Sequence, residues 1–125
     1  METKNLQNLV EAWLRFTRSK RDSEVRDELL WAYEEFARLS EEEPDACLSL
    51  ICAVLEEDAT MPVIGALAAG PMEDLLVNFG PGVIDNVEAI AEENGSFRAM
   101  LGGVWESDIE PQVWERITQV RDYCW

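Results

Sequence analysis

Histidine is missing from this sequence of 125 residues. Without an imidazole the chain lacks the commonest general base, the catalytic triads that depend on one, and most zinc sites. Its glycine-rich stretches are not followed by the Lys and Ser or Thr of a phosphate-binding loop, and no GxGxxG pattern occurs. The acidic runs lack the alternating oxygen ligands of a calcium loop. The sequence therefore predicts no catalytic residues, no cofactor and no metal site, and we expect the protein not to be an enzyme.

Long apolar runs are also missing. No window approaches the length needed to cross a bilayer, and the first residues, METKNLQNLVEAWL, lack the apolar core of an export signal. The three cysteines, Cys47, Cys52 and Cys124, contain no CxxC pair, and a helix would turn the first two away from each other. We interpret them as small buried thiols in a reducing compartment. These features predict a soluble, cytoplasmic protein.

Basic residues are absent between residues 39 and 97, where thirteen acidic residues occur. This block carries most of the net charge of −16, while the flanking segments are close to balance. Nucleic acids and anionic membranes select basic surfaces, so the charge argues against both as partners. The natural complement of such a chain is a basic protein.

No stretch alternates with a period of two, so we expect few or no strands. Apolar residues instead recur at spacings of three and four, as they do among residues 6–14. With 47% hydrophobic residues the chain is apolar enough to fold as one helical domain spanning residues 1–125. We predict an all-α fold, a compact stack of about seven or eight short helices in a HEAT-like α-α superhelix.

Capping residues and prolines predict the first three helices. Residues 5–18 form the first and residues 24–39 the second, with Asp22 or Ser23 as a cap between them. Val25 is expected on the core face of the second helix. Pro44 begins the third, a central helix that is apolar on almost every side.

Two Gly-Pro steps, Gly70-Pro71 and Gly80-Pro81, are each expected to end one helix and begin another. A left-handed glycine commonly ends a helix, and proline is accepted in a first turn. The chain should therefore turn sharply twice. Further helices are expected to end at Asn94, to end near Gly102-Gly103 and to follow Pro111.

Acidic residues in the first turn of a helix have a structural explanation, because they interact with the positive end of the helix dipole. We assign seven residues to this class: Glu41, Glu42, Glu43, Asp45, Glu73, Asp74 and Asp85. Acids at the carboxyl end oppose the dipole instead, and no neighbouring base in the sequence offsets them. Five residues are placed in this way and are our candidate partner-binding acids: Glu56, Glu57, Asp58, Glu92 and Glu93.

Tryptophan is concentrated near the end of the sequence. Trp114 lies on a helical stripe and is expected to pack in the core. Trp125 either docks back onto the protein as a lid or offers an aromatic anchor to another protein. We include Trp125 among the candidate partner-binding residues.

The stretch from Ala68 to Leu76 reads AAGPMEDLL; Gly80-Pro81, Phe97-Arg98 and the LGGVW of residues 101–105 follow it. This pattern resembles an uncharacterised family of small bacterial helical domains, in which a leucine usually stands where this chain has Met72. The likeness extends more loosely over nearly the whole chain. It implies a bacterial origin and a helical fold, and no settled activity.

We therefore expect a bacterial binding protein of the immunity or antitoxin kind, which neutralises a basic toxin by covering its cationic active-site cleft with an acidic face. The alternative is a structural adaptor or regulatory helical module that binds a protein or peptide through apolar and aromatic surface, including Trp105 or Trp125. A third possibility, an enzyme that uses carboxylates with a bound metal, would require tight metal binding.

Overall fold

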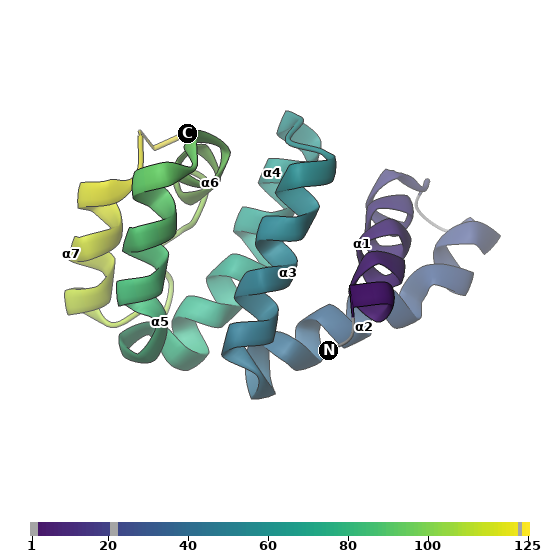
Figure 1. Cartoon of the computed structure of the whole chain (residues 1–125), viewed down its shortest axis with the longest axis horizontal. Helices are drawn as coiled ribbons and strands as arrows, with labels where there is room; N and C mark the ends of the chain where they lie inside the picture. Colours follow the sequence, from purple (N-terminus) through teal and green to yellow (C-terminus); the bar gives the residue numbers. More distant parts are fainter. Residues whose placement is uncertain (1–2, 21–22, 123) are drawn as a thin grey trace.

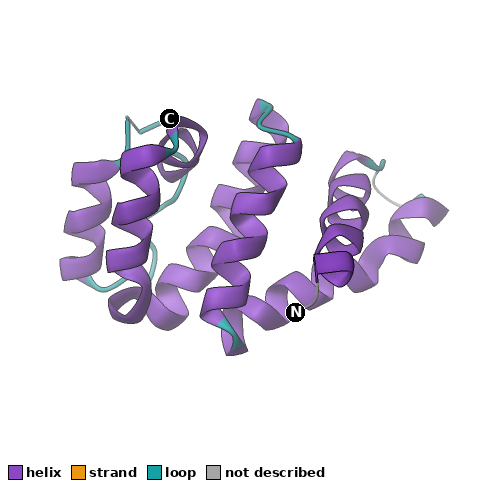
Figure 2. Cartoon of the chain, in the orientation of Figure 1, coloured by secondary structure: helices purple, strands orange, loops and turns teal. Residues whose placement is uncertain are grey.

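The computed structural model describes residues 3–20, 23–122 and 124–125, and it is all-helical, with no strand in those ranges (Figure 2). The predicted all-α class is confirmed. The helical elements are α1 (Thr3–Arg18), α2 (Glu24–Glu42), α3 (Pro44–Glu57), α4 (Met61–Leu67), the π-helical turn η1 (Ala68–Met72), α5 (Glu73–Glu93), α6 (Gly95–Leu101) and α7 (Pro111–Val120). Among them, none has an apolar stretch of the length that a membrane crossing requires.

Four helices follow one another across the molecule. α1 contacts α3, α3 contacts α5, and α5 contacts α7, as the order from purple to yellow in Figure 1 shows. α2 lies behind this row and contacts α1, α3, η1 and α5. Because α4, η1 and α5 follow each other without a loop, one long, bent helical segment crosses the middle of the molecule.

The core is one continuous cluster to which every helix contributes. α3 is central, as predicted: Cys47, Leu50, Ile51 and Val54 are fully buried on one face, and Leu48 is buried on another. Among the described residues, Ser40 is the buried polar side chain of the core. Its hydroxyl donates to the carbonyl of Ala37 at 2.7 Å, so its burial leaves no unpaired donor.

Several local predictions are confirmed. The Ser23 hydroxyl caps α2 by accepting a hydrogen bond from the backbone N–H of Arg26, whereas Asp22 lies outside the described residues. Asn94 ends α5 and caps α6 by accepting from the backbone N–H of Phe97 at 3.1 Å. Trp114 is partly buried against the core.

Val25 was expected in the core, but it is 45% exposed. The first turn of α2 directs Arg26 toward α1 instead. The guanidinium of Arg26 lies 4.1 Å from the ring centre of Phe16, and the stem and charge of Arg26 occupy the place expected for an apolar side chain. The expectation of three buried thiols is wrong for Cys124, which is exposed, while Cys47 is buried and Cys52 is half-buried.

α2 continues to Glu42, beyond its predicted end. Glu41 and Glu42 therefore lie in the last turn of α2, not in the first turn of α3. Arg38 compensates for this placement, since its guanidinium pairs with the carboxylates of Glu35, Glu42 and Glu43. Ion pairs at spacings of three and four stabilise a helix end that the acids alone would oppose.

Of the other acids assigned to a helix first turn, some lie there and one does not. Asp45, Glu73 and Asp74 do lie in the first turns of their helices. Asp85 lies inside α5, where Arg116 of α7 binds it at 2.6 Å and also binds Glu88. Asp85 thus forms an exposed ion pair between α5 and α7, which spacing along one segment could not indicate.

The two Gly-Pro steps do not end helices, and no described glycine adopts a positive φ. Gly70-Pro71 lies inside η1, where the wider turn accommodates a proline that lacks an N–H. Gly80-Pro81 lies inside α5, which kinks at Phe79 (φ −135°, ψ 16°) and then continues. Glycine precedes each proline because a Cβ there would clash with the proline ring in a helical conformation.

Candidate functional site

The carboxyl ends of α3 and α5 lie at the same edge of the molecule, at the top of Figure 1. Glu56 and Glu57 end α3, and Glu92 and Glu93 end α5; all four residues are exposed. We call these four residues the acidic edge. Among the described residues none of the four carboxylates forms an ion pair. The fold thus brings together four of the five acids that the sequence singled out.

Asp58, the fifth, is differently placed. Its carboxylate pairs with Arg18 of α1 and accepts hydrogen bonds from the backbone N–H and the hydroxyl of Thr60, at 2.9 Å and 2.6 Å. These hydrogen bonds, those from Thr60 first, lower the pKa of Asp58 to about 2. Asp58 therefore connects α1 to the start of α4, a role for which its position in the sequence gave no sign.

Arg98 of α6 offsets the negative end of α5. Its guanidinium donates to the backbone carbonyl of Ala91 at 2.6 Å and to the carboxylate of Asp122 at 3.1 Å. The sequence offers no neighbouring base for the ends of α3 and α5, but the fold brings Arg18 and Arg98 to them from other helices. The side chains of the acidic edge nevertheless remain outside these contacts.

A groove of about 610 Å³ runs between α3 and α5, below the acidic edge. Its charged lining residues are Asp45, at the amino end of α3, and Glu56, at the carboxyl end. The remaining lining residues are apolar or neutral: Leu6, Leu48, Ser49, Cys52, Ala53, Asn86, Ala89 and Ile90. Among the side chains that the structure describes, no basic one lines the groove, and one carboxylate stands at each end of it. We call this feature the α3–α5 groove.

Trp125 is docked onto its own chain. Its indole N–H donates to the carbonyl of Ala99 at 2.7 Å, and its backbone N–H donates to the carbonyl of Gly102 at 3.0 Å. A Cβ on Gly103 would lie 2.4 Å from the Trp125 ring, so the docked ring requires glycine there. Of the two alternatives for Trp125, the structure shows the lid, although 42% of the residue stays exposed.

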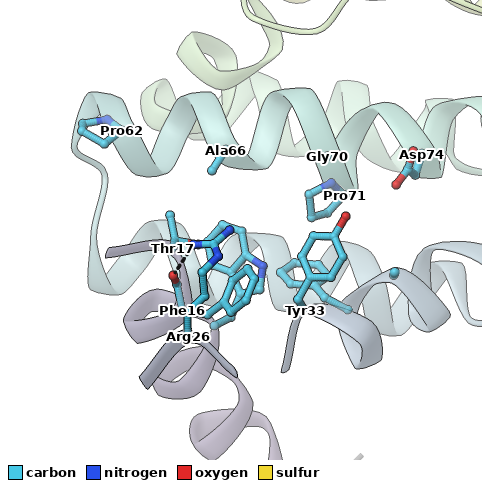
Figure 3. Close-up of a pocket in the computed structure, with 12 residues that line it drawn as sticks. Phe16, Thr17, Arg26, Tyr33, Pro62, Ala66, Gly70, Pro71 and Asp74 are labelled. Carbon is cyan, nitrogen blue, oxygen red and sulfur yellow. Dashed lines mark hydrogen bonds between the residues drawn. The ribbon is translucent and has the colours of Figure 1, made fainter. Parts of the chain in front are cut away.

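A second hollow, of about 380 Å³, lies between the α1–α2 pair and the continuous segment α4–η1–α5 (Figure 3). We call it the aromatic pocket. Twelve residues line it: Trp13, Phe16, Thr17, Arg26, Tyr33, Phe36, Ala37, Pro62, Ala66, Gly70, Pro71 and Asp74. The ring of Phe16 packs on Tyr33 with centroids 5.4 Å apart, and Trp13 meets Phe36 edge-on at the same distance. Aromatic side chains thus form much of its α1–α2 wall.

Two opposite charges line the aromatic pocket. Arg26 stacks on Phe16 and donates to the carbonyl of Phe16 at 3.1 Å. Asp74 stands on the opposite wall, beyond Pro71 in Figure 3. Asp74 is exposed at the pocket mouth, and partial loss of hydration, followed by the charge of Glu41, raises the pKa of Asp74 above its ordinary value.

The aromatic pocket is not predicted by the sequence patterns. The sequence indicates only a helix-dipole role for Asp74 and a turn at Gly70-Pro71. A signal was present, because Arg26, Tyr33 and Ala37 are spaced by seven and four residues and therefore share one face of a helix. The opposite wall could not be foreseen, since it depends on the continuation of the helix through Gly70-Pro71.

Within the described residues, no group of three or more Cys, Asp or Glu side chains could hold a metal ion.

The model of a family of unknown function, DUF6869, matches residues 19–124. The chain therefore belongs to this family, and the resemblance to an uncharacterised group of domains is confirmed. Neither the comparison with curated proteins nor that with solved structures found a match.

Proposed function

We propose that this protein is a non-enzymatic binding protein of the immunity or antitoxin kind. In this role it neutralises a basic toxin in the cytoplasm by covering the cationic cleft of the toxin with the acidic edge and the α3–α5 groove. We also propose that the row of α1, α3, α5 and α7, with α2 behind it, is a HEAT-like α-α superhelix in a single domain.

One observation carries the functional proposal: two acidic pairs that are distant in the sequence lie at one edge of the molecule, beside a groove whose described lining contains no basic side chain. Arg18 and Arg98 offset the carboxyl ends of α3 and α5, but they leave the four side chains of the acidic edge unpaired within the described residues. A surface of one sign accelerates the encounter with a partner of opposite sign and discriminates against others. The four acids oppose their own helix dipoles, which binding explains better than stability does.

The test begins with the protein encoded beside this one, purified as the candidate toxin. Its affinity is measured at about 50 mM and 300 mM salt for the wild type and for a variant with all four residues of the acidic edge changed to Gln. We expect the variant to bind about ten-fold more weakly at low salt, with a flatter salt dependence.

A charge-matched control changes four exposed acids elsewhere to Gln: Glu28, Glu34, Glu106 and Glu115. It removes the same net charge, so it isolates the position of the acids from their number. Equal losses in both variants would contradict a binding site at the acidic edge.

The alternative, a structural adaptor or regulatory module that binds through apolar and aromatic surface, is favoured by a different observation. Trp105 is 72% exposed and Trp31 is 50% exposed, large apolar areas for residues of their size. Binding of this kind would be insensitive to salt and would be lost in Trp105→Ala, while the Gln substitutions would leave it unchanged.

A further inference from the structure

The aromatic pocket is large enough for a ligand. Its volume of about 380 Å³ lies within the usual range for sites that take small molecules. Its two walls come from chain segments that are distant in the sequence, one from α1 and α2 (lining residues up to Ala37) and the other from α4, η1 and the start of α5 (lining residues from Pro62). It shares no residue with the acidic edge or with the α3–α5 groove.

The cation that lines the pocket already has partners. Arg26 lies over the face of Phe16 and donates to the backbone carbonyl of Phe16. The ring of Tyr33 also packs on Phe16, with the two rings inclined by 33°. The charge of Arg26 is therefore accommodated within the α1–α2 wall.

The acidic residue that lines the pocket, Asp74, has no such partner among the described residues. Asp74 forms neither an ion pair nor a side-chain hydrogen bond with the described residues. The charge of Glu41 acts on it with the same sign, and Arg38, on the same helix as Glu41, is already paired with three other carboxylates. A positive group placed beside Asp74 would interact with two negative charges, while Arg26 in the opposite wall is engaged with Phe16.

The surroundings of Asp74 suit a cation on an apolar stem. Figure 3 shows the ring of Tyr33 directed toward Pro71 and Asp74, so an aromatic ring and a carboxylate border the same space. This combination favours ammonium and guanidinium groups. Small side chains, Ala37 and Ala66, leave room along the pocket, and a Cβ added to Gly70 would meet no atom within 4 Å apart from its own helix and chain neighbours.

We propose that the aromatic pocket is a binding site for an ammonium or guanidinium group on an apolar stem, with the charge at Asp74 and the stem beside Tyr33 and Ala66. Two sources share this chemistry: a Lys or Arg side chain of a partner protein, and a free small amine or guanidine. The site goes beyond the proposed function and does not rest on it, because neither the acidic edge nor the α3–α5 groove contributes to it.

The experiment is a titration of the ¹⁵N-labelled protein, followed by NMR, with n-butylguanidinium, with its neutral near-isostere n-butylurea, and with N-acetyl-arginine amide. We expect the cations to shift the amide signals of pocket-lining residues and the urea to bind about ten-fold more weakly, since it lacks the charge. Pocket shifts from the free guanidinium alone would assign the site to a small molecule. Pocket shifts from the capped arginine would assign it to a protein side chain.

Two matched pairs of variants locate the site. Asp74→Asn should weaken the binding of n-butylguanidinium to the level of n-butylurea. Glu73→Gln, one residue away and outside the pocket lining, should leave this binding unchanged. Ala66→Leu should block the pocket, whereas Ala69→Leu, exposed in η1, should not. The proposal is overturned if no probe shifts the pocket signals, if the urea binds as well as the cations, or if the shifts occur at the acidic edge instead.

Discussion

Asp58 illustrates how single residues acquire roles from the rest of the chain. Its carboxylate contacts both Arg18 of α1 and Thr60 at the start of α4. The ion pair with Arg18 joins residues that are 40 positions apart in the sequence. The adjacent Glu57 has no such contact and stays exposed. Two neighbouring acids at one helix end therefore differ in function, one structural and one available to a partner.

Replacing Asp58 by Asn should lower the free energy of unfolding by about 1 to 2 kcal/mol, because a charged acceptor of several hydrogen bonds is lost. Urea denaturation at pH 7 measures this change, with Glu57→Gln as the control that should leave stability nearly unchanged.

The same residue has a pH signature. Its pKa in the folded protein, about 2, lies below the ordinary 3.8, so its contribution is present above about pH 4 and is lost as the pH falls from 4 to 2. The Asn variant should therefore approach the stability of the wild type in this acid range. A constant difference down to pH 2 would argue against the low pKa.

At the scale of elements, the Gly-Pro steps show one dipeptide accommodated in two ways. In η1 the wider turn takes up Pro71 without a break, while in α5 the backbone kinks at Phe79 before Pro81. Gly80 faces α7, where an added Cβ would lie 3.2 Å from both methyl groups of Val113. Gly82, two residues later, faces open space.

This difference predicts opposite effects for two alanine substitutions in one helix. Gly82→Ala should raise the free energy of unfolding by up to about 1 kcal/mol, since alanine favours the helix and meets no neighbour. Gly80→Ala should bring no gain or a loss, because its Cβ presses on Val113 and on the ring of Pro81. Thermal unfolding of the two variants measures the order of stability, and a reversed order would show that α5 and α7 are not packed through Gly80.

At the scale of the whole molecule, the described arginines lie largely between helices. Arg18, Arg98 and Arg116 each link carboxylates or carbonyls of a second element, and Arg38 neutralises the end of α2. The net charge is −16, and some of the excess carboxylates have no basic partner among the described residues. The acidic edge contains four such unpaired carboxylates, at the carboxyl ends of α3 and α5.

Removing the four carboxylate charges of the acidic edge should stabilise the protein when no partner is bound. The variant with four Gln residues at the acidic edge has a net charge of −12 instead of −16. Its free energy of unfolding in dilute buffer should rise by about 1 kcal/mol in total, because acids at helix carboxyl ends oppose the dipole. In about 0.5 M NaCl the advantage should shrink, since salt screens these charges. A loss of stability would instead assign these acids a structural role.

The sequence by itself determined the helical class, the central position of α3, the caps at Ser23 and Asn94, and the segments that supply the acidic edge. These features follow from the period of apolar residues and from capping chemistry, which act within a few positions of the chain. The continuation of helices through Gly70-Pro71 and Gly80-Pro81 escaped this reasoning, because packing of the flanking segments outweighs a local tendency to end a helix.

Only the tertiary structure decided which charges are paired, where Trp125 docks, and that Arg26, Tyr33 and Asp74 line one pocket. Each depends on groups from different elements meeting in space: Arg18 with Asp58, Gly103 with Trp125, and η1 with α2. The spacing of residues within one segment carries no information on contacts between different segments. The acids of the central block therefore share one composition, and the packing of the helices divides them into structural links and an exposed edge.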